Sequence, residues 1–420
     1  MIGPARAGRD DGKVGDVADR EFDVVLFGAS GFVGRLVAEQ LAAHAPAGTR
    51  VALAGRTPAR VAEVRDRLGV DWPVRTADSA DEESVRMLAE SAGVVVSTVG
   101  PYARHGLPLV RACAEAGTDY ADLTGEVLFV RQSIAVAHDR AAVTGARIVH
   151  SCGFDSVPSD LAVLLLADRA AADGAGELTD VDLLVRQVRG GFSGGTVDSM
   201  RNQLRETRED PELRRVAADP YALSPDRAAE PDLGRQPDVG PPSRLADGTW
   251  VAPFVMASYN TRVVRRSNAL LDHRYGRALR YREFVATGTS WSSPFTATAA
   301  TAGQALLGVA IAQPWLSPVV DRVLPSPGQG PSEKARREGH FRLEVRATTT
   351  SGARYRATVA ASGDPGYAAT SVMLAQSALD LADTRHDGQR GGVLTPAVAL
   401  GEGLADRLRA RGFTFDVEDA

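Results

Sequence analysis

The sequence is poor in cysteine and has no concentrated basic region. Its 420 residues include two cysteines, Cys113 and Cys152, and their spacing fits neither a disulfide framework nor a metal motif. The seven histidines form no metal-like pair, and the formal net charge is −5. A nucleic-acid-binding protein would normally carry a basic patch or stripe. We therefore expect no nucleic-acid partner, no metal site and a reducing, cytoplasmic location.

Secretion signals and long apolar runs are also missing. The first 20 residues are polar and charged, without the apolar stretch of a signal peptide, so we expect a disordered leader over residues 1–20. No segment has the Leu/Ile/Val/Phe-rich run of a transmembrane helix.

One segment, residues 284–320, contains no Asp, Glu, Lys or Arg, and its middle is rich in Ala, Thr and Gly. Such small residues suit a buried helix or a subunit interface. They equally suit an acyl-binding or lipid-facing surface, which would predict peripheral association with membranes. A true membrane span is disfavoured by the many Thr and Ser residues.

From residue 21 to residue 157, short β-branched runs alternate with longer helical patterns. Strands are expected at 22–27, 51–54, 73–76, 94–99, 119–123 and 146–151, with helices between them. The strands are apolar throughout, which is typical of a parallel sheet covered by helices on both faces. The pattern predicts an α/β fold in which residues 21–157 form a doubly wound Rossmann domain.

The alternation of strands and helices ends after residue 158. A strand is expected at 181–188, a long surface loop at 222–248, and a hairpin of strands 340–350 and 354–361 around Ser351-Gly352. Strands grouped with strands predict an α+β domain with an antiparallel sheet over residues 158–364, for substrate binding or dimerisation. A helical pattern returns at 365–383.

The strongest motif follows the first strand and reads Gly28-Ala29-Ser30-Gly31-Phe32-Val33-Gly34. The glycines permit a tight turn and close approach of the backbone to a pyrophosphate, and the next helix presents its N-terminal amides to the anion. The spacing is GxxGxxG rather than GxGxxG, but it lies within a full βαβ unit. We therefore predict a dinucleotide site that includes Gly28, Ser30, Gly31, Phe32, Val33 and Gly34.

The end of the second strand indicates which dinucleotide binds. An NAD enzyme usually places an acidic residue there for the ribose 2′-hydroxyl. This sequence instead has Ala54-Gly55-Arg56-Thr57. A guanidinium suits a 2′-phosphate, so Arg56 and Thr57 favour NADP(H), although Arg56 as a solvated surface charge is the alternative.

Two further loops are expected at the same edge of the sheet. Asp78 follows the third strand and either borders the adenine or belongs to the cap of the next helix. Val99, Gly100 and Pro101 follow the fourth strand, where a turn would bring backbone against the cofactor and place Tyr102 near the nicotinamide. A purely structural turn, with Tyr102 packed on the next helix, is the competing interpretation.

Long and unusual strings in the chain resemble the saccharopine dehydrogenase family, and within it the trans-acting enoyl reductases of mycobacteria. The resemblance is carried by FGASGFVG (27–34), LAGRTPARV (53–61), STVGPYARHGLPLVRACAEAGTDYADLTGE (97–126), HSCGFDSVPSDLAV (150–163), YNTRVVRRSNAL (259–270), GHFRLEVRATTTSGARYRATVA (339–360) and GGVLTPAVALGEGL (391–404). It covers almost everything from residue 21 onward.

The resemblance implies an NADP-binding Rossmann domain paired with an α+β domain, with C-terminal helices, residues 365–420, folded back onto the first. It implies reduction of a C=C bond in an acyl thioester carried by a polyketide synthase or acyl carrier, on the way to phthiocerol-type cell-envelope lipids. A homodimer follows by family analogy.

Such chemistry requires hydride at the β-carbon, a proton at the α-carbon and donors for the enolate oxygen. Tyr102 is the predicted catalytic proton donor, since a phenol can donate a proton and stabilise an enolate. The other candidates near the sheet edge are Tyr120, Asp122, Thr124, Glu126 and Asp155. No Ser/His/Asp or Cys/His arrangement is expected.

Two other functions remain open from the sequence. The first is a saccharopine-reductase-like oxidoreductase for amino or imino acids, whose carboxylates Arg262, Arg265 and Arg266 would bind. The second is a non-catalytic NADP-binding scaffold in a lipid-synthesis complex. The uncharged segment favours a lipid chain over an amino acid.

Overall fold

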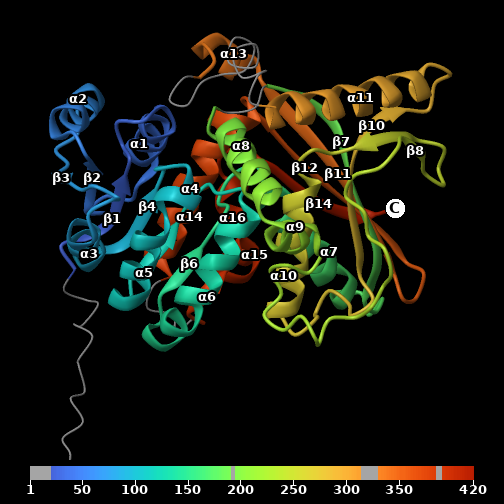
Figure 1. The fold of residues 1–420 in the computed structure, drawn as a ribbon, viewed down its shortest axis with the longest axis horizontal. Coiled ribbons are helices and arrows are strands. Elements are labelled where there is room, and N and C mark those ends of the chain that lie inside the picture. The colour runs from blue at the N-terminus through green and yellow to red at the C-terminus, as the bar shows by residue number, and fades with distance from the viewer. Residues whose placement is uncertain (1–19, 191–193, 314–329, 385–389) are drawn as a thin grey trace, which may run out of the picture.

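The computed structural model describes residues 20–190, 194–313, 330–384 and 390–420. The predicted leader falls almost wholly outside these residues. Two seven-stranded sheets lie beside each other, each with helices packed on it (Figure 1). We refer to them as sheet A and sheet B.

Sheet A is parallel throughout, with the strand order β13-β6-β5-β4-β1-β2-β3. Its strands are β1 (Phe22–Phe27), β2 (Val51–Gly55), β3 (Val74–Thr76), β4 (Ala92–Ser97), β5 (Asp119–Ala121), β6 (Arg147–Val149) and β13 (Gly392–Leu394). The connecting helices are α1 (Phe32–His44), α2 (Pro58–Leu68), α3 (Glu82–Ser91), α4 (Tyr102–His105), α5 (Leu107–Ala116) and α6 (Val127–Thr144). The predicted Rossmann fold is confirmed.

Alternation along β1 explains why helices cover both faces of sheet A. Val24 and Leu26 belong to one hydrophobic core, whereas Val25 and Phe27 belong to another on the opposite face. Successive side chains of a strand point to opposite faces, so a strand that is apolar at every position requires cover on both.

Sheet B has the order β14-β12-β11-β7-β10-β9-β8. Its strands are β7 (Leu178–Arg189), β8 (Ser243–Arg244), β9 (Trp250–Pro253), β10 (Arg280–Gly288), β11 (His340–Thr349), β12 (Arg354–Ser362) and β14 (Thr414–Asp419). The predicted hairpin is present as β11 and β12. The expectation of a wholly antiparallel sheet is wrong, because β10 pairs parallel with β7. Helix α10 (Ala257–Leu270) connects β9 to β10. Strand β10 therefore runs antiparallel to β9 and in the same direction as β7.

Helix α7 (Val157–Ala172) packs against sheet B and is buried along most of its length. Its leucines share one hydrophobic core with Val24 and Leu26 of sheet A and with Leu183 and Val345 of sheet B. Because one core serves both sheets, one face of sheet A and the sheet B region form a continuous packed body.

The C-terminal region contributes to both sheets. The π-helical turn η3 (Pro365–Ala369) leads into α14 (Thr370–Asp383), which is almost wholly buried and packs on α1, β1, β4 and β5. Strand β13 then joins sheet A beside β6, α15 (Pro396–Ala399) and α16 (Gly401–Arg409) follow, and β14 joins sheet B beside β12. These two edge strands have no counterpart in the sequence-based prediction, which expected helices here.

The uncharged segment forms the end of β10 and then α11 (Ser293–Ala312); residues 314–320 of it lie outside the described chain. The interpretation of this segment as a buried helix is wrong, because Phe295 and Leu306 are each 70% exposed and the helix is largely uncovered. In the part of the chain that the structure describes, α11 alone is long and apolar enough to cross a membrane, judged by length and composition.

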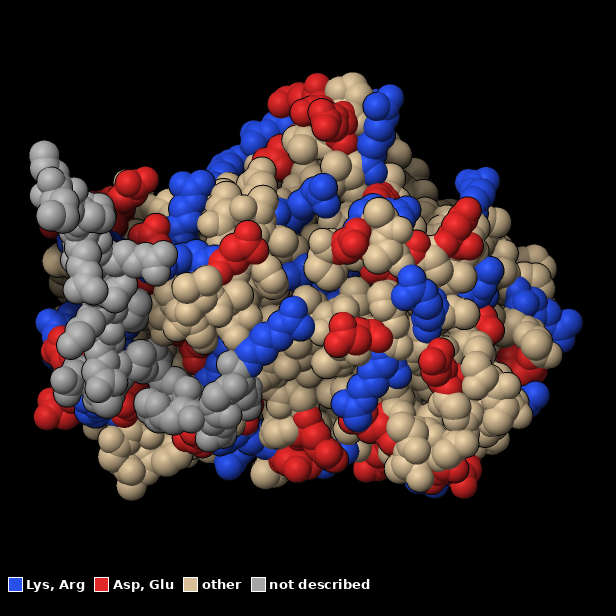
Figure 2. All heavy atoms as spheres, turned by 90° about the horizontal axis from the view of Figure 1, so that it is seen from below, with Lys and Arg blue, Asp and Glu red and all other residues tan. Residues whose placement is uncertain are grey.

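Two helices, α8 (Gly194–Glu209) and α9 (Pro211–Ala218), precede the long loop, and α13 (Glu333–Glu338) precedes β11. Basic and acidic side chains are interspersed over the face shown in Figure 2, with no stripe of one sign. That distribution agrees with the mixed charge of the sequence.

Candidate active site

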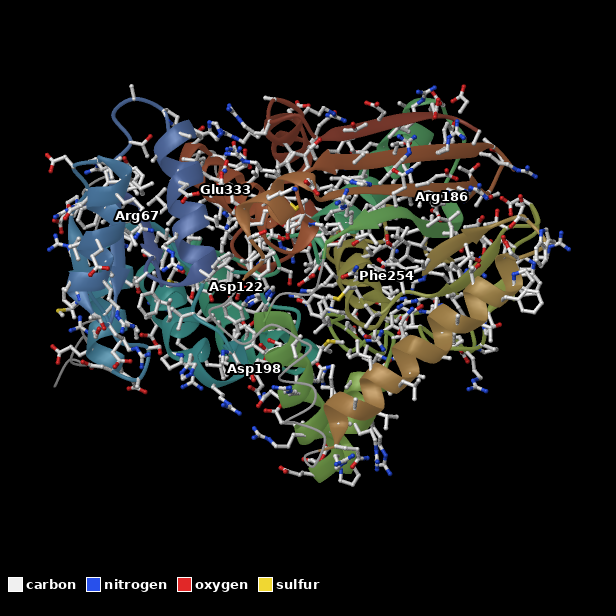
Figure 3. All side chains as sticks on the ribbon, turned by 90° about the horizontal axis from the view of Figure 1, so that it is seen from above. Arg67, Asp122, Arg186, Asp198, Phe254 and Glu333 are labelled. Atoms are coloured by element: carbon white, nitrogen blue, oxygen red, sulfur yellow. The ribbon has the colours of Figure 1, made fainter. Side chains whose placement is uncertain are left out.

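A cavity of about 910 Å³ opens between the carboxyl edge of sheet A and the helices α8, α10 and α11. Figure 3 shows two of its lining residues, Asp198 on α8 and Phe254 after β9, near the middle of the molecule. In a doubly wound sheet this edge is where ligands bind. The cavity therefore lies where both a nucleotide and a substrate are expected.

The lining residues follow the order of the strands along this edge. They are Arg56 after β2, residues 31–34 after β1, residues 100–102 after β4, Leu123 and Gly125 after β5, and Ser151, Gly153 and Asp155 after β6. Neighbouring strands lie about 4.8 Å apart, so the four steps from β2 to β6 span about 19 Å. Arg56 and Asp155 thus mark opposite ends of an elongated site.

The glycine-rich turn after β1 has the geometry that a pyrophosphate needs. Gly28 has φ +91°, and a Cβ on Gly34 would lie 2.1 Å from the carbonyl oxygen of Gly28. Gly31 is the N-cap of α1 and supplies no side-chain hydrogen bond to the first-turn amides. These amides are thus available to an anion at the cavity, which Gly31, Phe32, Val33 and Gly34 line.

Arg56 lies at the cavity and is exposed, so its guanidinium is accessible to a 2′-phosphate. Thr57 is the N-cap of α2 without a side-chain cap bond, and it does not line the cavity. Asp78 also lies outside the lining; its Oδ1 accepts from the backbone N of Ala80 at 3.1 Å. Asp78 therefore closes the turn before α3, in agreement with the capping alternative.

The loop after β4 meets the cavity through Gly100, Pro101 and Tyr102. Val99 does not line it and instead packs towards Gly28, where an added Cβ would lie 2.9 Å from the Val99 side chain. Gly28 and Ser30 shape the turn without lining the cavity. Ser30 is held by Arg35, whose Nη1 donates to its carbonyl oxygen at 3.0 Å.

Tyr102 reaches the cavity wall, but its hydroxyl is engaged by the protein. The hydroxyl donates to the backbone oxygen of Ser97 at 3.0 Å and accepts from the backbone N of Leu123 at 3.2 Å. Burial, together with the negative Asp122, raises the pKa of Tyr102 well above its ordinary value. This arrangement makes Tyr102 a link between the β4 and β5 loops and leaves it no free proton to donate.

Glu126 fixes the same loop from its other side. Its carboxylate accepts from the backbone N of Tyr102 at 3.1 Å, from that of Ala103 at 3.2 Å and from Ser199 Oγ at 2.8 Å. Burial raises the pKa of this carboxyl group, while the three donors oppose that rise. Glu126 thus ties the β4 loop to α8 rather than capping only its own helix.

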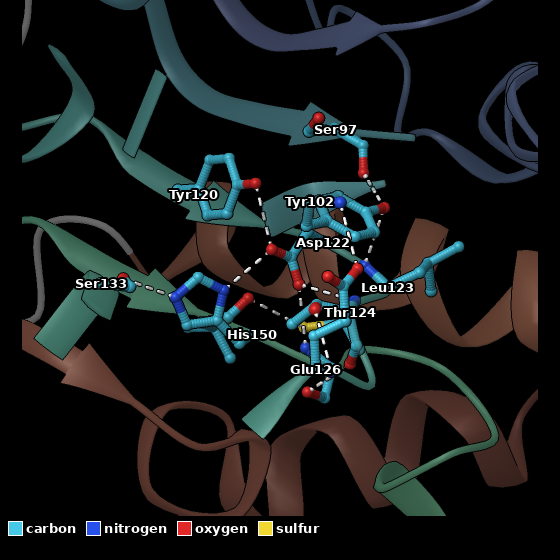
Figure 4. A network of polar contacts seen from close by, with 12 residues as sticks. Ser97, Tyr102, Tyr120, Asp122, Leu123, Thr124, Glu126, Ser133 and His150 are labelled. Carbon is cyan, nitrogen blue, oxygen red and sulfur yellow. Dashed lines mark hydrogen bonds and ion pairs between the residues drawn. The ribbon is translucent and has the colours of Figure 1, made fainter. Parts of the chain in front are cut away.

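Asp122 is the centre of a buried polar network (Figure 4). Its Oδ2 accepts from Tyr120 at 3.0 Å and pairs with His150 Nδ1 at 2.8 Å, and its Oδ1 accepts from the backbone N of Thr124 and of Ser151. His150 Nε2 lies 2.7 Å from Ser133 Oγ. The sequence predicted no Ser/His/Asp arrangement, yet Ser133, His150 and Asp122 form a hydrogen-bonded chain. Since all three residues are buried and none lines the cavity, the chain is positioned to hold loops rather than to attack a substrate.

Ser151 is held in an unusual conformation at the end of β6, with φ +66°. Asp122 anchors its backbone N at 3.1 Å, and its Oγ donates to the backbone oxygen of Thr124 at 2.8 Å. Tyr259 of α10 contacts the same Oγ, and because the serine proton is already used, the tyrosine must be the donor. Non-glycine residues with positive φ are costly and concentrate at functional sites.

Tyr259 is more than a hundred residues from Ser151 in sequence, and no local pattern marked it as a site residue. Sequence reasoning also missed Ser151 and Thr98, which line the cavity. The string that contains Ser151 supported the family resemblance. The position of Ser151 at the cavity could be recognised only once the order of the strands in sheet A was known.

The far end of the cavity is mainly apolar. Helix α8 contributes Met200 and Leu204, the segment after β9 contributes Phe254 and Met256, and α11 contributes small residues. These are Thr301, Ala305 and Gly308, together with Gln304, whose Nε2 donates to the backbone oxygen of Pro253 at 2.9 Å. Such a surface suits a hydrocarbon chain.

The arginines of α10 do not form a carboxylate site at this cavity. Arg262 forms an ion pair with Asp238, Arg265 donates to Gln236 at 3.1 Å, and Arg266 donates to backbone oxygens. All three arginines are buried and lie outside the cavity lining. Of the described residues that line it, Arg56 is the single lysine or arginine.

Residues 20–190, 194–313, 330–384 and 390–420 contain no group of three or more His, Cys, Asp or Glu side chains arranged to hold a metal. Cys152 is buried and its thiol has a pKa raised by burial, so it is a neutral side chain.

Comparison with known proteins adds a family match. Residues 24–149 match the family model described as "Saccharopine dehydrogenase NADP binding domain". A protein of Mycobacterium tuberculosis with the provisional name of trans-acting enoyl reductase is 54% identical over 94% of this chain and 96% of its own length. A trans-acting enoyl reductase of Mycobacterium bovis is 50% identical over 94% of this chain and 97% of its own length.

Among solved structures, an L-Glu-forming saccharopine dehydrogenase from Saccharomyces cerevisiae is similar with a TM-score of 0.53 and 14% identity. The similarity covers 95% of this chain and all of that one. At this identity the likeness concerns the fold, and it extends across both sheets.

Proposed function

Because the chain belongs to the saccharopine dehydrogenase family and is an NADP-dependent oxidoreductase of the enoyl reductase type, we propose that it uses NADPH to saturate the C=C bond of a long acyl thioester. The acyl chain would be presented in trans by a polyketide synthase or an acyl carrier. The product would enter cell-envelope lipids of the phthiocerol type.

One observation carries this proposal: the nucleotide end and an apolar end belong to the same cavity. The residues that line it run from Arg56 and the glycine turn to Met200, Phe254 and Gly308. A site of this form can hold a reduced nicotinamide beside a hydrocarbon chain and exclude water from both.

The bound dinucleotide supplies the hydride, and this chain's residues supply its position. The amides at the start of α1 would bind the pyrophosphate, and Arg56 would bind the 2′-phosphate. Asp122, Glu126 and Tyr102 hold the β4, β5 and β6 loops in fixed relation through buried hydrogen bonds. Preorganised loops of this kind reduce the cost of aligning the reacting atoms.

The amino-acid alternative is disfavoured by charge. A substrate with several carboxylates needs arginine or lysine partners. Arg262, Arg265 and Arg266 are committed to protein partners away from the cavity. An apolar acyl chain is the better match for the lining.

The test is oxidation of NADPH by the purified protein in the presence of enoyl-pantetheine thioesters of short and long chain. We expect turnover that rises with chain length, and a product two hydrogens heavier by mass spectrometry. Turnover with amino or imino acids instead would establish the saccharopine-like alternative. If the protein binds NADPH but oxidises it with none of these substrates, the non-catalytic NADP-binding scaffold becomes the favoured function.

We further propose that the protein works in the cytoplasm and touches membranes through α11. Its outer side presents Phe295, Leu306 and Val309, all more than half exposed, and Trp291 just before the helix is 86% exposed. Replacing Phe295, Leu306 and Val309 together by serine should abolish co-sedimentation with phospholipid vesicles. Serine at Val143, a valine on α6 that is more exposed than any of these three residues, serves as the control. Equal sedimentation of both variants would contradict the proposal.

A further inference from the structure

Asp155 is a half-buried acidic residue of the cavity, and its surroundings differ from those of the buried carboxylates Asp122 and Glu126. It lies in the loop between β6 and α7 and lines the cavity. Asp122 receives four hydrogen bonds and Glu126 receives three. Among the described residues, none forms a hydrogen bond or an ion pair with the Asp155 carboxyl group.

Removal from water raises the pKa of Asp155 from 3.8 to about 6, and no charged neighbour contributes to that rise. Burial of this kind favours the neutral acid. An apolar acyl chain seated beside the carboxyl group would remove further water and favour the acid more. A carboxyl group with these properties holds a transferable proton at pH values up to about 6.

None of the titratable groups around Asp155 contributes to its raised pKa. Tyr259 of α10 faces it, and burial raises the pKa of that phenol well above its ordinary value. Glu126, at the start of α6, is fixed by its three donors, and Asp198 of α8 lies elsewhere along the cavity wall. The titration of Asp155 is therefore governed by its burial rather than by an ion pair.

The two phenols of the site cannot replace it as acids. The Tyr102 proton is donated to Ser97, and the Tyr259 proton is directed to Ser151. Asp155 also stands at the β6 end of the sheet edge, about 19 Å in strand spacings from the Arg56 end. A dinucleotide bound along this edge would place its 2′-phosphate at Arg56 and the reacting bond near Asp155.

We propose that Asp155 is the catalytic acid that delivers the proton to the α-carbon of the substrate, an inference that rests on the proposed enoyl reduction. As hydride from NADPH forms the C–H bond at the β-carbon, the π electrons of the C=C bond move into an enolate. The O–H bond of Asp155 then breaks, its proton forms the C–H bond at the α-carbon, and the electron pair remains on the carboxylate. Water at the cavity mouth returns the proton.

Asp155→Asn keeps the size of the side chain and removes the acid. In the NADPH assay with a long-chain enoyl thioester we expect kcat to fall by about 100-fold or more, with Kd for NADPH unchanged. Wild-type kcat should decline as the pH rises above about 6, because the acid form is lost, and the variant should show no such decline. Asp155→Glu should restore part of kcat and the pH dependence. Asp71→Asn, an exposed acid away from the cavity, is the matched control.

The outcomes separate the two proposals. If wild type turns over and Asp155→Asn retains kcat within threefold with an unchanged pH profile, the role of Asp155 is overturned and enoyl reduction stands. If wild type binds NADPH but reduces no enoyl thioester, both proposals fail. Unchanged NADPH binding by Asp155→Asn shows that the variant is folded, so a loss of kcat with the pH dependence would establish the acid.

Discussion

At the scale of single residues, partners decide what each carboxylate of the site does. Asp122 and Glu126 are saturated with donors and hold loops, whereas Asp155 has a raised pKa and an open cavity in front of it. Residue type alone does not separate these roles. The sequence offered all three as candidate acids and favoured Tyr102, whose hydroxyl the structure commits to backbone groups.

Arg56 should determine the choice of cofactor. Arg56→Ala is expected to raise Kd for NADPH by about 10- to 100-fold, the value of a charge-assisted hydrogen bond, and to leave Kd for NADH nearly unchanged. Titration of protein fluorescence with each nucleotide measures both. Arg60→Ala, an exposed arginine on α2 outside the cavity, is the control. Equal losses for both nucleotides would refute the assignment.

Asp155 should also make the free energy of unfolding depend on pH. Its pKa is higher in the folded protein than its ordinary value of 3.8, so the folded state binds this proton more tightly than the unfolded state. The free energy of unfolding therefore falls as the pH rises from 3.8 to about 6, by about 3 kcal/mol from this one group.

Urea unfolding of wild type and Asp155→Asn, below and above this window, measures the effect. The variant should gain stability relative to wild type as the pH rises. A constant difference between the two proteins at every pH would mean that Asp155 is not perturbed.

At the scale of helices and strands, the order of elements was predictable and the partners of the last ones were not. Short apolar strands that alternate with helical patterns define β1 to β6 locally, so the sequence was sufficient for them. Strand β13 is three residues long, and its pairing with β6 depends on a contact far away in sequence. The contact of Tyr259 with Ser151 and the parallel pairing of β7 with β10 also join residues far apart in sequence, so local patterns did not predict them.

Helix α11 should set the chain length that the cavity accepts. A Cβ at Gly308 meets no atom within 4 Å, so Gly308→Leu fits the helix and extends into the cavity that Gly308 lines. We expect KM for a long-chain enoyl thioester to rise about 10-fold, the value of about two buried methylenes, and that for a short chain to change little. Gly303→Leu is the control, since Gly303 also has open space but does not line the cavity. A uniform change for all chain lengths would count against the assignment of this end to the acyl chain.

At the scale of the whole molecule, one hydrophobic core connects the two sheets. Val24 of sheet A, Leu161 of α7, Val345 of sheet B and Leu374 of α14 all belong to it. The predicted homodimer stays a prediction. The sheet B strands carry ion pairs such as Arg186–Glu344 and Arg282–Asp182, which favour contact with water or with a charged partner surface.

The shared core predicts that the protein unfolds in one step. Circular dichroism and tryptophan fluorescence should give coincident thermal transitions, and NADPH at 100 times its Kd should stabilise the whole protein by about 2.7 kcal/mol. Two separated transitions, with only one shifted by NADPH, would show that the sheets unfold independently.

The path of the C-terminal region has a consequence for dissecting the gene. The chain passes from sheet A to sheet B after β6, returns through α14 and β13, and passes again to sheet B as β14. A fragment that stops after residue 157 would lose β13 and expose the backbone edge of β6. The parallel sheet that carries the nucleotide-binding motif is therefore built from two separate stretches of the sequence, and a chimera that exchanges sheet B between relatives needs three junctions rather than one.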